Sequence, residues 1–175
     1  MNNQVFRTLE FDKILNMLSS YGVMELTKKS ILEPKVSDNI KKVNKMQDET
    51  AEAITLVTKK GSPPIMCTAD VRSSLKRARM SGVLSIGEIL AVGKVLETSR
   101  RLKSYPDDIE VPSMGEHFDA LWENKDLEKR IFQSIVDDET LADDASPELG
   151  DIRRKIRVAN NKVRETLRSI ISSPT

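Results

Sequence analysis

The feature that most constrains the fold is a heptad pattern in the last segment of the chain. Ser146 is a favoured residue at a helix N-terminus, and Pro147 suits the first helical position. Residues of the predicted seam then recur at alternating spacings of three and four, at Leu149, Ile152, Ile156, Ala159, Val163, Thr166 and Ile170. This spacing is that of a coiled coil, so we predict one long helix whose seam needs a second helix against it.

No helix of comparable length follows this seam before the sequence reaches Ser173, Pro174 and Thr175. We therefore expect either a module that stops before its partner helix or a chain that dimerises through the seam. On this basis the chain divides into the N-terminal part of a helical core domain over 1–145 and the start of a long helix over 146–175.

The rest of the chain also has helical periodicity. Apolar residues at helical spacing predict six further helical stretches and a short seventh, near 9–18, 23–32, 40–60, 71–80, 86–105, 117–122 and 126–135. On the third of these, the residues expected to face inward are Ile40, Val43, Met46, Ala53, Ile54 and Val57. Expected N-terminal caps are Ser37 or Asp38, Asp70, and two capping boxes, Ser85 with Glu88 and Ser113 with Glu116.

Strand content is expected at one place only. The apolar pairs Ile135-Val136 and Leu141-Ala142 flank a stretch of turn composition, which favours a small hairpin. The predicted fold class is therefore all-α: a helical bundle with a long, coiled-coil-like C-terminal helix and at most one small β-hairpin.

Composition and charge exclude several classes of protein. The chain has 28 Lys+Arg against 27 Asp+Glu, so global charge favours neither nucleic acid nor an anionic membrane. No apolar run approaches the ~20 residues of a membrane span, and the N-terminus lacks the pattern of a signal peptide. Cys67 is the only cysteine, which excludes an internal disulfide and a multi-thiolate metal site. We expect a cytoplasmic protein with no membrane partner.

The sequence contains no recognisable catalytic constellation. His117 is the single histidine, and no second histidine could share a metal with it, so we interpret it as a helix-surface residue. Cys67 has no neighbour that would stabilise a thiolate. The stretch 87–95 resembles a phosphate-binding loop, but it has five residues between its glycines and lies inside a predicted helix. We expect no catalytic residue, cofactor site or metal site in this chain.

Charged clusters provide the remaining candidates. For the acidic run, we favour a solvated hairpin near a helix N-terminus over a cation site; its members are Asp137, Asp138, Glu139, Asp143 and Asp144. Two basic clusters could contact phosphates, and their candidate residues are Arg72, Arg77, Arg153, Arg154, Arg157, Arg164 and Arg168. Neither basic cluster has the interleaved aromatic residues of single-strand binders, so solvated faces with local ion pairs remain the alternative.

Three segments together resemble one protein family. They are TLEFDKIL (8–15), DVRSSLKRARMSGVLSIGEIL (70–90) and LADDASPELGDIRRKIR (141–157), and they resemble, in this order, the N-terminal region of the second bacterial MutS paralogue, the Smr-bearing MutS family. GSPP at 61–64 departs slightly from the GDPP expected in that connector. Like the family, the chain lacks a Phe-x-Glu mismatch-reading motif.

The resemblance implies a non-catalytic module: the first part of a core domain plus the outgoing lever, which ends before the clamp. A full-length protein would add an ATPase domain that uses ATP and Mg and forms the homodimer, and a C-terminal Smr endonuclease domain. The resemblance also implies action on branched DNA, with suppression of recombination, and on stalled or collided ribosomes, which are split. The alternatives are a nucleic-acid-binding or ribosome-binding module that uses the basic last helix, and a homodimeric coiled coil.

Overall fold

The computed structural model describes residues 8–33, 36–66 and 69–172. In these ranges the chain forms α2 (Phe11–Ser20), α3 (Glu25–Leu32), α4 (Ile40–Lys60), α5 (Arg72–Arg79), α6 (Ile86–Lys103), α7 (Gly115–Asp119), α8 (Lys125–Ser134) and α9 (Pro147–Ser172). The described ranges contain no strand, only an isolated antiparallel bridge between Ile135 and Leu141. The all-α prediction is confirmed, and the expected hairpin is reduced to this bridge.

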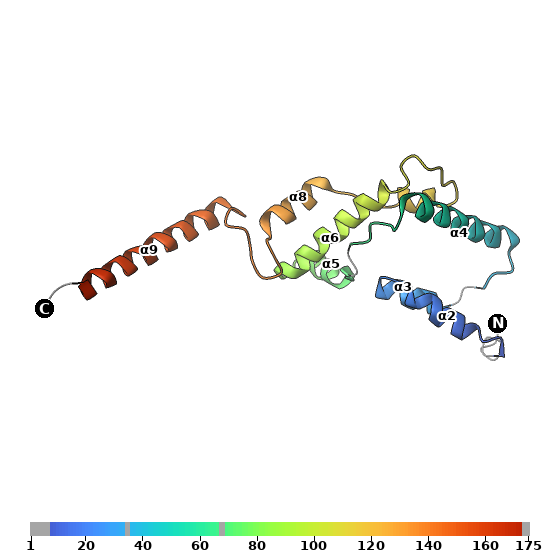
Figure 1. The fold of residues 1–175 in the computed structure, drawn as a ribbon, viewed down its shortest axis with the longest axis horizontal. Helices are drawn as coiled ribbons and strands as arrows, with labels where there is room; N and C mark the ends of the chain where they lie inside the picture. Colours follow the sequence, from blue (N-terminus) through green and yellow to red (C-terminus); the bar gives the residue numbers. More distant parts are fainter. Residues whose placement is uncertain (1–7, 34–35, 67–68, 173–175) are drawn as a thin grey trace.

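The molecule is elongated, with its two ends at opposite extremes (Figure 1). At one end α2 and α3 pack against each other beside α4. The centre is formed by α6 and α8, with α5 next to α6. At the other end α9 extends away from this body as a single arm, and no described helix lies alongside it in the picture.

The hydrophobic core lies between α6 and α8. Leu90 and Leu96 on α6 form a buried cluster with Ile131 and Ile135 of the α8 region. Gly93 allows the two helices to approach closely, since a Cβ atom built there would lie 2.8 Å from Ile131 Cγ2. The cluster is small, so the body of the molecule also depends on polar contacts.

One such set of contacts holds α4 against the loop before α7. The Glu52 carboxylate accepts hydrogen bonds from the backbone N–H groups of Ser113 and Met114, at 2.9–3.1 Å. Lys45 forms an ion pair with Glu116 at 2.9 Å. The predicted Ser113–Glu116 capping box is therefore wrong: Glu116 is drawn to Lys45, and α7 begins at Gly115 with no side-chain cap.

The inward face predicted for α4 is also largely wrong. Ile40 is 68% and Ile54 is 63% exposed, whereas Leu56 on another side of the helix is 1% exposed. The reason is that α4 meets the rest of the body through the side that carries Lys45, Glu52 and Leu56, and helical spacing places these three residues together. Of the predicted apolar side, Met46 lines a pocket with residues of α2 and α3, Val43 and Ala53 are half-buried, and Ile40, Ile54 and Val57 are exposed.

The predicted caps of α6 and α9 are confirmed. Ser85 and Glu88 form the expected reciprocal capping box at the start of α6. Ser146 accepts the N–H of Leu149 at 3.1 Å, and Pro147 opens α9.

Two further predicted caps are corrected. Asn39, rather than Ser37 or Asp38, caps α4, because the Ser37 hydroxyl instead accepts the N–H of Asn39. Asp70 precedes the N-cap position of α5 by one residue, although it still accepts the N–H of Arg72 at 3.1 Å.

Candidate functional site

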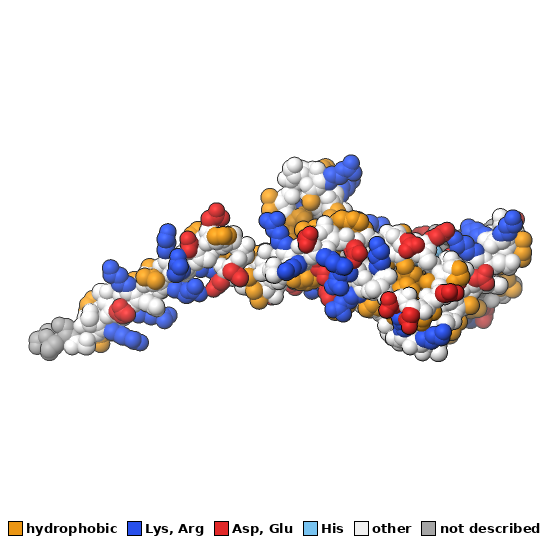
Figure 2. Space-filling view, turned by 90° about the horizontal axis from the view of Figure 1, so that it is seen from above, with side chains coloured by type: hydrophobic (Ala, Val, Ile, Leu, Met, Phe, Trp, Pro, Cys, Tyr) orange, Lys and Arg blue, Asp and Glu red, His pale blue; other side chains and the backbone are white. Residues whose placement is uncertain are grey.

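The candidate site is the α9 arm. The helix has 26 residues, which at 1.5 Å per residue corresponds to a rod about 39 Å long. Figure 2 shows Lys and Arg side chains along this arm, with hydrophobic side chains interleaved among them. The arm therefore presents two kinds of surface, an apolar seam and a basic flank.

The seam side chains lie on one face of α9 and are open to solvent. Ile152, Ile156, Val163 and Ile170 are each 53–65% exposed. Ala159 and Thr166 are exposed as well, and Leu149 at the base is half-buried. Leu167, 53% exposed, adjoins this face and was missed by the sequence analysis, because it falls outside a strict pattern of alternating three and four. Exposed apolar stripes of this spacing are typical of helices that pack against another helix.

Two of the predicted phosphate-contacting arginines are engaged at the base of the arm. Arg153 donates to Asp143 Oδ1 and, at 2.9 Å, to the carbonyl oxygen of Leu141. Arg157 donates to Asp143 Oδ2 at 2.9 Å. The two guanidinium groups lower the pKa of the Asp143 carboxyl, Arg153 more than Arg157. Sequence reasoning placed Asp143 near the helix dipole and gave no signal for this contact.

Three other candidate arginines also have carboxylate partners. Arg154 pairs with Asp151 at 2.7 Å one turn away on α9. On α5, the Arg72 guanidinium donates two hydrogen bonds to Asp70, and these bonds together with that from the Arg72 backbone N–H lower the pKa of Asp70 to about 2. Arg77 pairs with Glu88 of α6.

Arg164 and Arg168 have a different setting. Both are exposed, and in the described part of the chain neither makes an ion pair. The structure thus does not gather the seven predicted arginines into one patch. It leaves this outer pair, together with Lys155 and Lys162, as the cations of the arm that are open to a ligand.

Two of the remaining chemical candidates lie where the sequence predicted them. His117 lies on α7 with its side chain 64% exposed, and its Nε2 atom is 3.3 Å from Glu49 Oε1, so the helix-surface interpretation is confirmed. The stretch 87–95 lies inside α6, as predicted. Within the described ranges no group of three or more metal-ligating side chains could hold a metal ion, and no helix could cross a membrane. Cys67 lies outside the described residues.

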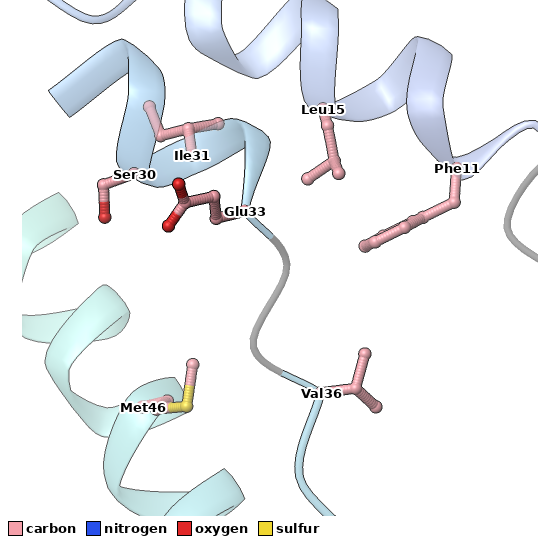
Figure 3. Close-up of a pocket in the computed structure, with 7 residues that line it drawn as sticks. All are labelled: Phe11, Leu15, Ser30, Ile31, Glu33, Val36 and Met46. Carbon is pink, nitrogen blue, oxygen red and sulfur yellow. The ribbon is translucent and has the colours of Figure 1, made fainter. Parts of the chain in front are cut away.

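A pocket of about 430 Å³ lies between the N-terminal helices and α4. Figure 3 shows Phe11 and Leu15 of α2 and Met46 of α4 extending toward this space, with Ile31 and Glu33 at its side. The lining is mostly apolar, with Ser30 and Glu33 as its polar members. The pocket brings together side chains of α2, α3 and α4.

Taken together, these features define a class of protein: a helical body that carries one long arm with an open coiled-coil seam. No protein-family model matches the chain. It does match proteins named Endonuclease MutS2. The protein from Ruminiclostridium cellulolyticum is 38% identical over 177 residues, covering 99% of this chain and 22% of that protein.

Two further relatives carry the same name. The Acetivibrio thermocellus protein is 36% identical over 179 residues, and the Clostridium perfringens (strain 13) protein is 32% identical over 179 residues. The matches cover 99% and 100% of this chain, but only 22% and 23% of those proteins. The chain is a MutS2-like sequence over nearly its whole length, which confirms the resemblance, and it spans about a fifth of the length of these curated relatives.

Proposed function

We propose that the chain is the core and lever module of a MutS2-like ATPase, with α9 as the outgoing lever. The observation that supports this proposal is the open heptad seam of α9 in a chain that matches only 22% of its relatives' length. The module has no activity of its own and passes nucleotide-dependent movement from the ATPase domain to the clamp. ATP and Mg bind elsewhere in the full-length protein.

A lever must be stiff, and α9 becomes stiff only when it is paired. A continuous helix paired with a second helix is a rod that can transmit a displacement along its length, whereas a single exposed helix bends and frays. Ile152, Ile156 and Val163 make the pairing contacts. Full burial of each such side chain stabilises the pair by about 1.5–3 kcal/mol. The partner helix belongs to the remainder of the same polypeptide.

The full-length protein would be an endonuclease, as the name of its relatives, Endonuclease MutS2, states of them. It would also form a homodimer through the ATPase domain and have a cytoplasmic location. One target is branched DNA, on which the protein suppresses recombination. The other is stalled or collided ribosomes, which it splits. The protein acts on one of these targets or on both.

Ile156→Asp in the full-length protein tests the lever. A carboxylate buried against the partner helix is unpaired, so the variant should hydrolyse ATP but fail to couple hydrolysis to DNA or ribosome processing. The matched control is Val158→Asp on the same helix outside the seam, at a position that is 63% exposed. Normal processing by Ile156→Asp, or equal loss in both variants, contradicts the proposal.

A second candidate function is direct binding of nucleic acid or the ribosome by the arm. The observation in its favour is that Lys155, Lys162, Arg164 and Arg168 make no ion pair within the described residues. Phosphate contacts release counterions, so this function predicts that binding by the purified chain weakens steeply with salt. Arg164→Gln combined with Arg168→Gln should abolish such binding, whereas Arg154→Gln, which removes a cation already paired with Asp151, should not.

A further inference from the structure

We infer that Asp143, through its contacts with Arg153 and Arg157, fixes the direction in which α9 leaves the body. We call these contacts the joint. The two carboxylate oxygens of Asp143 are held by two arginines one helical turn apart, Oδ1 by Arg153 and Oδ2 by Arg157. A single contact would leave α9 free to swing and roll about that contact. Two contacts at successive turns of one helix restrict both its tilt and its rotation about its own axis.

The joint connects the arm to the hydrophobic core. Arg153 also donates to the carbonyl oxygen of Leu141 at 2.9 Å, and Leu141 forms the antiparallel bridge with Ile135. Ile135 is 6% exposed and belongs to the buried cluster between α6 and α8. A displacement of α8 therefore reaches the first turns of α9 through a continuous chain of contacts.

The turn between the bridge and the helix folds back on the arm. The backbone carbonyl oxygen of Asp143 lies 3.3 Å from the position that a Cβ atom of Gly150 would occupy. The turn therefore packs closely against the first turn of α9. Ser146 caps the same turn. The turn limits where α9 can begin, and the arginine contacts select one direction within that limit.

The contacts are also releasable. The side chains of Asp143 and Arg157 are 57% and 65% exposed, and that of Arg153 is 31% exposed. Exposed ion pairs are weakened by salt and by competing anions. The joint thus holds α9 in one orientation and can release it without unfolding the core. The use of this joint in coupling rests on the proposed lever function, but the joint itself is a property of this chain.

A distance measurement between spin labels on the body and the arm tests the joint. In a Cys67→Ser background, cysteines replace Lys129 on α8 and Ser169 on α9, both exposed. The unmodified joint should give one narrow distance distribution. Asp143→Asn should broaden it by about twofold or more, because the arm is no longer held at two points. Asp144→Asn, with the same change of charge at the next residue, should leave it narrow.

A second pair of variants covers the arginine side. Arg157→Gln should broaden the distribution and Arg164→Gln should not, while circular dichroism verifies that all variants keep their helices. Salt at ~1 M, where the Debye length is about 3 Å, should also broaden the distribution of the parent chain. An unchanged distribution in both Asp143→Asn and Arg157→Gln overturns the inference. The distance measurement needs neither the clamp nor the ATPase domain. A result against the joint therefore leaves the lever function untouched, and a result against the lever function leaves the joint untouched.

Discussion

Glu128 on α8 accepts both prongs of the Arg100 guanidinium on α6, with Arg100 Nε 2.9 Å from Oε2 and Nη2 2.6 Å from Oε1. Glu128 is 8% exposed and the Arg100 side chain is 33% exposed. The hydrogen bonds from Arg100 lower the pKa of Glu128 despite its burial. This pair supplements the small apolar cluster where α6 and α8 meet.

Glu128→Gln should destabilise the chain by about 1–3 kcal/mol, because it leaves the partly buried guanidinium of Arg100 without a charged partner. Urea unfolding measures the difference. The control is Arg101→Gln, which removes the more exposed Glu97–Arg101 pair of α6 and should cost no more than about 0.5 kcal/mol. Equal losses in the two variants would contradict a special role for Glu128.

Gly93→Ala tests the close approach of α6 and α8. Alanine favours a helix interior over glycine by about 1 kcal/mol, so propensity alone predicts stabilisation. The added Cβ would lie 2.8 Å from Ile131 Cγ2, and overpacking should reverse the sign to a net loss of about 1–3 kcal/mol. Gly115→Ala at the start of α7, where nothing lies within 4 Å, is the control and should be neutral or stabilising. Thermal unfolding measures the effect. If Gly93→Ala stabilises the chain, α6 and α8 can move apart to accommodate the added methyl group, and their close approach is not required for stability.

Acid stability should depend on Glu88. The N–H of Ser85, the hydroxyl of Ser74 and the guanidinium of Arg77 hydrogen-bond to its carboxylate and lower its pKa from 4.5 to about 2. Because the folded-state pKa is depressed, the stabilisation is fully present above pH 4.5 and is lost as the pH falls toward 2.

Urea midpoints of the parent chain and of Glu88→Gln, followed from neutral pH downward, isolate this contribution. The difference between the urea midpoints of the two proteins should be constant above pH 4.5 and should disappear toward pH 2. A difference that persists unchanged into acid would mean that the charge of Glu88 does not carry the stabilisation.

The sequence predicted those features that are local in the chain. The 3.6-residue periodicity located the helices, and the short-range spacings of Ser85 with Glu88 and of Ser146 with Pro147 located two helix starts correctly. The same local rule failed at Ser113, because its N–H is taken by Glu52, 61 residues earlier. Local spacing carries no information on such a competitor.

The candidate site shows the same division. The seam of α9 could be predicted because its residues repeat within one helix. The engagement of Arg153 by Asp143 and by the Leu141 carbonyl could not, because it depends on how the bridge at Ile135 turns the chain. The α4 face was missed because charged residues of that helix make the tertiary contacts that apolar residues were expected to make: Glu52 binds the loop before α7, and Lys45 pairs with Glu116 of α7.

The purified chain should be a monomer with an unfilled seam. Ile156 is 53% exposed, so Ile156→Asp should change the stability of the isolated chain by no more than about 0.5 kcal/mol. Ile131→Ala in the core, at 7% exposure, should cost about 2–5 kcal/mol. Sedimentation at two concentrations should give the same monomeric mass. A concentration-dependent dimer that Ile156→Asp abolishes would favour the homodimeric coiled coil instead.

The most direct test of the lever account is to identify what fills the seam. A photo-crosslinking amino acid replaces Ile156 in the full-length protein that carries this chain, and Val158 on the same helix serves as the control position. The account predicts that the Ile156 probe crosslinks to a helix of its own polypeptide, and that the Val158 probe does not. Crosslinking from position 156 to a second subunit or to nucleic acid would contradict it.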